Sequence, residues 1–286
     1  YILHIIVVMF LLILITLVDL ARPYLIKIAI DNHLTVIAKD ATSFTQHAHE
    51  LFKLVLFYLL LIVASLGLNY AQAMLLQVTG QRIIYTMREQ VFAHLLKLDI
   101  SYFDANPIGR LVTRVTNDIQ NLEEMYSGVI VTLFKDFFLL AGIIVVMLRL
   151  NTTLAFISFA VIPLIVIATI IYQNYARKAF RAIRFHLAQV NSFLQEHLSG
   201  MRIIQSFKRE PFKYKEFQRY NNKLHQANMA ELWSFATFRP SMDLMYALGL
   251  ALLIWYGGGQ VIQGAVSFGV LYAFINYLEQ FFRPIN

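Results

Sequence analysis

A polar stripe follows one face of the last apolar segment of the sequence. Its members are Tyr272, Asn276, Glu279 and Arg283. Their spacings of four, three and four residues place them on one side of a helix. Ionisable groups inside a membrane span cost roughly 2.5 to 3.5 kcal/mol to insert. The stripe therefore indicates a water-accessible cavity.

Aromatic residues beside this stripe offer surface for apolar or cationic solutes. They are Phe274, Tyr277, Phe281 and Phe282. Any single ring can instead face lipid or a neighbouring helix. The sequence predicts a substrate pathway that includes Tyr272, Asn276, Tyr277, Glu279, Phe281 and Arg283.

Two further charged residues stand three apart in the first apolar segment. Asp19 and Arg22 can pair across one helical turn, next to an expected kink at Pro23. We interpret them as a structural pair. In the outer loop, His47, His49 and Glu50 are residue types that can bind a metal ion, and they lie close together in the sequence. Such a group in a loop is more often only solvated, so we predict no metal site.

The composition requires a membrane environment for these groups. The chain is 58% hydrophobic and 14% charged, with a mean hydropathy of +0.60, which is far too apolar for a soluble domain. The net charge of +7 comes from Lys and Arg that cluster beside apolar segments, so it reflects membrane topology rather than nucleic-acid binding. The absence of Cys excludes disulfides and thiolate metal sites.

The predicted fold is an all-α membrane domain with six crossings. Apolar runs of sufficient length lie near 2–30, 51–78, 128–150, 153–174, 241–263 and 267–286. Helical patterning continues through polar sequence after the second and fourth runs. The pattern from Leu51 to about Lys97 alone predicts a rod of roughly 70 Å at about 1.5 Å per residue.

These polar extensions carry most of the Lys and Arg, so the positive-inside rule makes them cytoplasmic. The connections at 33–50, 150–152 and 264–267 then face outward. The sequence predicts a multi-pass integral protein, placed in the plasma membrane of a bacterium.

Each extension contains an aromatic joint. At 98–107, Asn106 is expected to cap a new helix with Pro107 in its first position, while Tyr102 and Phe103 need a cover outside the lipid. At 205–217, Pro211 permits a break among Phe207, Phe212 and Phe217. The rings can pack back on their own helices, but two such joints favour a cytoplasmic partner that docks on them.

With both joints in view, the whole chain, residues 1–286, resembles the transmembrane domain of an ABC exporter. The resemblance rests on Phe103, Asp104, Gly109, Arg110, Leu111, Arg114 and Asp118, and on Ser199, Gly200, Ile204, Phe207, Glu210 and Phe217. It implies that the joints are coupling helices seated on ATP-binding domains, the second on the domain of the partner subunit. The implied contact residues are Tyr102, Phe103, Asp104, Phe207, Lys208, Arg209 and Phe212.

The sequence contains no G-x-x-x-x-G-K-[ST] phosphate loop. We therefore expect no catalytic residue and no cofactor in this chain, with ATP and Mg²⁺ bound by a nucleotide-binding domain after the sixth helix. The start at Tyr1 and the end at Asn286 suggest a piece of a longer protein that also lacks the family's N-terminal elbow helix. The full-length protein is expected to be a transport ATPase.

The predicted function is that of one membrane half of an exporter, which moves a drug, lipid or peptide outward by alternating access. A second half completes the cavity, as a homodimer or a heterodimer. One alternative is an ion-coupled transporter or channel that uses Asp19, Asp243 and Glu279, but it leaves the joints unexplained. Another alternative is a membrane-anchored scaffold without transport.

Overall fold

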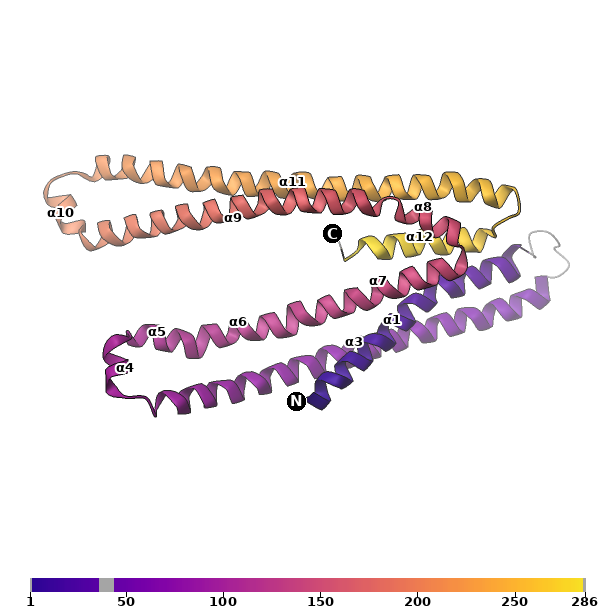
Figure 1. Cartoon of the computed structure of the whole chain (residues 1–286), viewed down its shortest axis with the longest axis horizontal. Coiled ribbons are helices and arrows are strands. Elements are labelled where there is room, and N and C mark those ends of the chain that lie inside the picture. Colours follow the sequence, from indigo (N-terminus) through magenta and orange to yellow (C-terminus); the bar gives the residue numbers. More distant parts are fainter. Residues whose placement is uncertain (1, 36–43, 285–286) are drawn as a thin grey trace. The chain divides into compact units, whose positions relative to one another are not determined.

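The computed structural model describes residues 2–35 and 44–284, and all regular structure within them is helical (Figure 1). The helices, with π-helical segments labelled η, are α1 (Ile2–Ala29), η1 (Ile30–Leu34), α3 (Phe44–Leu95), α4 (Ile100–Ala105), α5 (Ile108–Thr113), η3 (Arg114–Asp118), α6 (Ile119–Glu124), η4 (Met125–Ile130), α7 (Val131–Leu150), α8 (Thr152–Phe159), α9 (Ile162–Ser199), α10 (Met201–Ser206), α11 (Glu210–Ile262) and α12 (Phe268–Phe282). The predicted all-α class is confirmed.

Five helical stretches of the described chain are long and apolar enough to cross a membrane. They are Leu3–Leu34, Ala48–Leu95, Ile108–Leu150, Thr152–Ser199 and Glu210–Ile262. The sixth predicted crossing, 267–286, contains α12, whose 15 residues span less than the roughly 20 that a bilayer requires. That crossing therefore stays a prediction.

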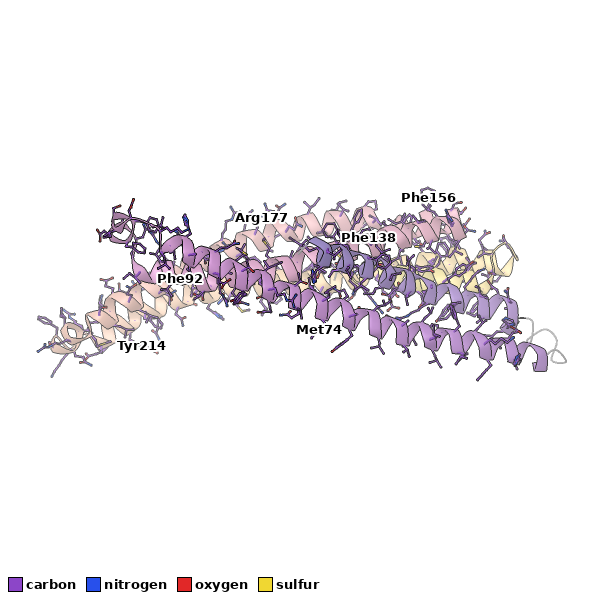
Figure 2. All side chains as sticks on the ribbon, turned by 90° about the horizontal axis from the view of Figure 1, so that it is seen from below. Met74, Phe92, Phe138, Phe156, Arg177 and Tyr214 are labelled. Atoms are coloured by element: carbon purple, nitrogen blue, oxygen red, sulfur yellow. The ribbon has the colours of Figure 1, made fainter. Side chains whose placement is uncertain are left out.

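The helices expose large apolar side chains over much of their length. On α3, Phe52, Val63 and Leu66 are each about two-thirds exposed. Figure 2 labels Met74 and Phe92 farther along the same helix, and both of these side chains are exposed too. A soluble protein rarely leaves so much contiguous apolar surface open. The hydrocarbon core of a membrane can cover this apolar side-chain surface. A helix is suited to that environment because its backbone groups hydrogen-bond within the helix.

The chain divides into two compact units, which are described separately. The first comprises residues 1–155 and 253–285. Within it α1 packs against α3, α7 and α12. Its core contains Leu12, Ile143 and Phe274, all fully buried. Gly142 of α7 allows close packing, because a Cβ there would overlap the side chain of Leu20 on α1.

The second unit comprises residues 156–252 and contains the long helices α9 and most of α11. Aromatic pairs join the two helices. Tyr172 stacks on Phe238 with ring centroids 4.1 Å apart, and Phe193 lies 5.3 Å from Tyr220.

The predicted span at 153–174 is interrupted in the structure. Helix α8 ends at Phe159 and α9 begins at Ile162. The physical reason is Pro163, which has no N–H to donate to the carbonyl of Phe159 and so cannot continue the helix. The predicted crossing nevertheless lies within Thr152–Ser199, a stretch that is long and apolar enough to span a membrane.

The third apolar stretch, Ile108–Leu150, contains two π-helical segments, η3 and η4. Such segments hold one more residue per turn than an α-helix and are frequent at functional sites. They lie in the part that the sequence places outside the membrane and at its border.

Candidate functional site

The first turn joins α3 to α5 through the short helix α4, as Figure 1 shows. The predicted N-cap role of Asn106 was wrong. Pro107 occupies the N-cap position of α5, and the Asn106 side chain turns back toward α4. Its Nδ2 donates to the Tyr102 carbonyl at 2.8 Å, and its Oδ1 accepts from Arg110. Asn106 thus donates a hydrogen bond to a carbonyl in the last turn of α4, where the helix itself supplies no donor.

Tyr102 and Phe103 have different surroundings in this turn. Tyr102 is half-buried and lines a small cavity with Leu95 and Leu111. Arg114 Nη1 lies 3.4 Å from the Tyr102 hydroxyl and donates to it. Phe103 packs edge-on against Tyr102, with ring centroids 5.9 Å apart, and is 38% exposed. Tyr102 therefore holds the turn together, whereas Phe103 presents a ring at its surface.

Two isoleucines extend this exposed surface. Ile100 and Ile108 are 79% and 72% exposed, at the start of α4 and of α5. Asp104 is also exposed. The sequence analysis missed Ile108 as a surface residue, although its place directly after Pro107, in a segment predicted to lie outside the lipid, was the available signal.

The second turn lies earlier than predicted. Helix α9 ends at Ser199, α10 ends at Ser206, and α11 already begins at Glu210. The predicted range 205–217 was therefore wrong at its far end. Pro211 does not break a helix, because it sits in the first turn of α11, where its missing N–H has no partner to lose.

The aromatic residues of this second turn divide in the same way as those of the first. Phe207 and Phe212 are 72% and 59% exposed. Phe217 is half-buried and lies 6.0 Å from Phe193 of α9, between ring centroids. Phe217 thus packs α11 onto α9, and the exposed rings lie toward the tip of the hairpin.

Lys208 gives the tip an unusual backbone. Its φ of 49° lies in the left-handed region, which non-glycine residues rarely adopt. The Lys208 N–H donates to Gln205 O and the Arg209 N–H donates to Ile204 O, at 3.1 and 3.0 Å. These are the two bonds of a Schellman motif, a position that usually selects Gly. The chain accepts strain here and keeps an exposed cationic side chain.

Charges continue along the start of α11. Lys213 Nζ donates to Glu216 Oε2 at 2.8 Å, and this hydrogen bond lowers the pKa of Glu216. Lys208 and Arg209 are exposed. The tip of the second hairpin therefore combines exposed aromatic side chains with positively charged ones.

The predicted pathway residues of α12 separate into two groups. Glu279 and Arg283 are exposed and pair at 3.2 Å, and Asn276 Nδ2 donates to the Tyr272 carbonyl at 3.0 Å. Tyr277 and Phe281 are buried against neighbouring helices of this chain, and their place in a substrate pathway stays a prediction. The Tyr277 hydroxyl donates to the Leu20 carbonyl at 2.7 Å, which fixes α12 to α1.

The remaining ionisable candidates, Asp19, Arg22 and Asp243, lie on two different helices, α1 and α11. Arg22 Nη1 is 3.4 Å from Asp19 Oδ1 on α1, beside Pro23 inside that helix. Asp243 is exposed on α11 in the second unit. Among the described residues no three His, Cys, Asp or Glu side chains gather as a metal site, and the side chain of His47 lies outside that set.

Comparison with known proteins covers nearly all of the chain. The family described as the ABC transporter transmembrane region matches residues 5–285. The chain is 35% identical over 79% of its length to the probable multidrug resistance ABC transporter ATP-binding/permease protein YheH of Bacillus subtilis, of which the match covers 34%. It is 29% identical over 94% of its length to the ATP-dependent lipid A-core flippase of Syntrophus aciditrophicus, of which the match covers 47%. The chain thus spans between about a third and a half of these relatives.

Proposed function

Because the chain belongs to the family of ABC transporter transmembrane regions, we propose that it forms one membrane half of an ATP-driven exporter. The chain is an integral, multi-pass membrane protein, and its bacterial relatives place it in the bacterial plasma membrane. In this proposal it moves a hydrophobic or amphipathic solute outward by alternating access. A second half of the same kind completes the pathway.

The observation that carries the proposal is the pair of hairpin tips. Each long helix pair ends in a six-residue helix, α4 or α10, that is too short to be stable by itself. Around them the exposed apolar side chains are Ile100, Phe103, Ile108, Ile203, Phe207 and Phe212. We propose that cytoplasmic ATPase domains cover these tips and drive the helices as levers.

The contact residues differ in their proposed roles. Phe103, Phe207 and Phe212 insert into the ATPase domains, Asp104, Lys208 and Arg209 provide charged contacts, and Tyr102 positions Phe103 from behind. ATP and Mg²⁺ belong to the ATPase domains in this scheme. In this proposal the energy of ATP binding is transmitted to the membrane helices through these tips.

The proposed substrate class rests on the apolar surfaces of the membrane helices and on the names of the related proteins. The relatives include a protein named for multidrug resistance and one named for lipid A-core flipping. We propose apolar or amphipathic substrates, with Glu279 and Arg283 at the polar stripe of α12. Glu279→Gln should then change the transport of cationic more than of neutral substrates.

The proposal is tested with the full-length protein reconstituted in liposomes. Drugs, lipids and peptides are compared for stimulation of ATP hydrolysis and for movement across the bilayer. We expect at least one amphipathic class to raise hydrolysis severalfold and to be transported. A protein that transports only when an ion gradient is imposed, without ATP, would overturn the exporter assignment.

A further inference from the structure

Two adjacent residues of opposite charge lie inside the third predicted membrane crossing. Lys135 and Asp136 belong to α7, and the crossing is predicted to begin near residue 128. At about 1.5 Å per residue, Lys135 lies roughly 10 Å along the helix from that point. Ionisable groups at such a depth are costly, and they usually face the interior of a helix bundle and pair there with another polar group. Each of the two charges therefore needs a partner.

The described part of the chain does not supply these partners. Among residues 2–35 and 44–284, neither Lys135 nor Asp136 makes an ion pair or a hydrogen bond through its side chain. The ion pairs of α1 and α12 each join two residues of one helix, so those charges are already engaged. Lys135 and Asp136 do not face each other either, because adjacent residues of a helix point about 100° apart. Both charges are thus left for a partner outside this chain.

The packed side of α7 carries both side chains. Two helical turns bring Lys135 into line with Gly142, where an added Cβ would overlap the side chain of Leu20 on α1. In the same way Asp136 lines up with Ile143, which is fully buried. Lys135 and Asp136 are nevertheless only half-buried. They are turned away from the lipid, but the helices of this chain do not enclose them.

Adjacent opposite charges suit a partner related by two-fold symmetry. Lys135 and Asp136 differ by only about 1.5 Å in height along α7, so they lie at nearly the same depth. A two-fold axis along the membrane normal leaves the depth of every residue unchanged and makes every contact reciprocal. Where two copies of α7 approach each other about such an axis, Lys135 of each copy meets Asp136 of the other. An unlike partner would have to carry both charges at the matching depth.

We propose that Lys135 and Asp136 form two reciprocal ion pairs with a second copy of this chain inside the membrane. The inference rests on the proposed function, which assembles two membrane halves, and it deepens that function by making the second half an identical copy held by charges. Attraction between charges is stronger where water is excluded. Removing one member of such a pair leaves the other charge uncompensated, which is strongly destabilising. The pairs therefore favour an identical copy over a half that lacks either charge.

The test uses the full-length protein, with two differently tagged copies co-expressed and mixed dimers isolated through both tags. Lys135→Asp gives a copy with two acidic residues, and Asp136→Lys gives a copy with two basic ones. Dimers of either variant alone place like charges opposite each other, so we expect their midpoint of thermal unfolding in nanodiscs to fall by several degrees. The mixed dimer has opposite charges at both contacts and should recover the wild-type midpoint. Interactions within one chain cannot produce this recovery, because each copy still carries two like charges.

A second measurement locates the contact without relying on charge. A mixed dimer of Lys135→Cys and Asp136→Cys, in a full-length background without other cysteines, is treated with ethanediyl bis-methanethiosulfonate, a crosslinker similar in length to the ion pair that it replaces. We expect a crosslinked dimer on a denaturing gel. Phe137→Cys is the matched control, because Phe137 is 65% exposed and points to another side of α7, and this variant should not crosslink.

Wild-type midpoints for the two variants alone would overturn the proposal. A mixed dimer no more stable than its parent variants would overturn it too, as would the absence of a crosslink between positions 135 and 136. A native assembly with only one copy of this chain would have the same consequence. Neither measurement requires ATP or a substrate, so the outcomes are separable: a protein that crosslinks but does not export would refute the proposed function alone.

Discussion

Asp31 and Gly269 join the end of the first helix to the start of the last. Asp31 Oδ1 accepts a hydrogen bond from the Gly269 N–H at 2.8 Å, and Ser267 Oγ donates to Asp31 Oδ2 at 2.6 Å. Lys27 Nζ lies 3.5 Å from the same carboxylate. A carboxylate at a helix N-terminus is favoured by the free amides and by the helix dipole. The start of α12 is therefore held in place by η1.

Gly269→Ala should weaken this junction. A Cβ at Gly269 would lie 2.5 Å from the Lys27 carbonyl oxygen and 2.6 Å from Asp31 Oδ1, so backbone has to move. We expect a loss of about 1 to 3 kcal/mol, typical of overpacking, seen as a lower midpoint of thermal unfolding in detergent. The control is Gly258→Ala on α11, where a Cβ meets nothing within 4 Å. Equal midpoints for both variants would contradict the expectation.

Tyr277→Phe removes the hydroxyl that α12 donates to the Leu20 carbonyl of α1. The ring stays buried, so the change isolates one hydrogen bond. We expect a destabilisation of about 1 kcal/mol in the same thermal measurement. Tyr272→Phe, on the half-buried side of α12, is the matched control and should have little effect.

Phe103→Ala should separate ATP hydrolysis from transport. The ring is 38% exposed and its aromatic contact is with Tyr102 of the same turn, so we expect the midpoint of unfolding to change little. The number of solutes moved per ATP should fall severalfold in liposomes. Phe52→Ala, which removes an exposed ring near the opposite end of α3, should leave that ratio intact.

Tyr102 provides a second test of the same turn. Tyr102→Ala should also reduce coupling, but together with stability, because the ring lines the small cavity at the end of α3. Tyr102→Phe keeps the ring and loses only the bond from Arg114, so coupling should be largely retained. Full coupling in both alanine variants would mean that these rings only pack on their own helices.

Lys208→Gly should stabilise the second turn, because Gly adopts a φ of 49° without the clash that Lys meets there. The gain is about 1 kcal/mol, measured as a raised midpoint of unfolding. Lys215→Gly also removes a positive charge, but from the interior of α11, and should cost about 1 kcal/mol. Lower coupling in Lys208→Gly, despite the added stability, would support a contact role for its charge.

The features that could be predicted from the sequence are local or compositional. The long helices follow from apolar periodicity, and the Asp19–Arg22 pair follows from its spacing. The predicted role of Asn106 was wrong because an Asn between two helices can hydrogen-bond the end of the preceding helix or the start of the following one. The tertiary path of the chain decides between them. The second turn was predicted too late in the sequence. The helix ends just before Lys208, and neither Gly nor Pro stands at that position to indicate it.

Other features depend on contacts between distant parts of the chain. Periodicity shows that Tyr277 and Glu279 point to different sides of a helix, but not that the Tyr277 side meets Leu20. Likewise, Glu123 stands in a polar stretch, and its burial results from packing against Gln81, 42 residues earlier. Such positions require the tertiary structure.

The π segment η3 changes how the third membrane stretch should be aligned with related sequences. Leu111 and Ile119 are both buried and lie on either side of η3. In an unbroken α-helix each residue turns by about 100°, so these two positions would diverge by about 80°. One extra residue in a turn restores them to within about 20°. A homologue that is one residue shorter between Arg114 and Asp118 would present the same side chains on the same side, so a single-residue gap there preserves the helical phase.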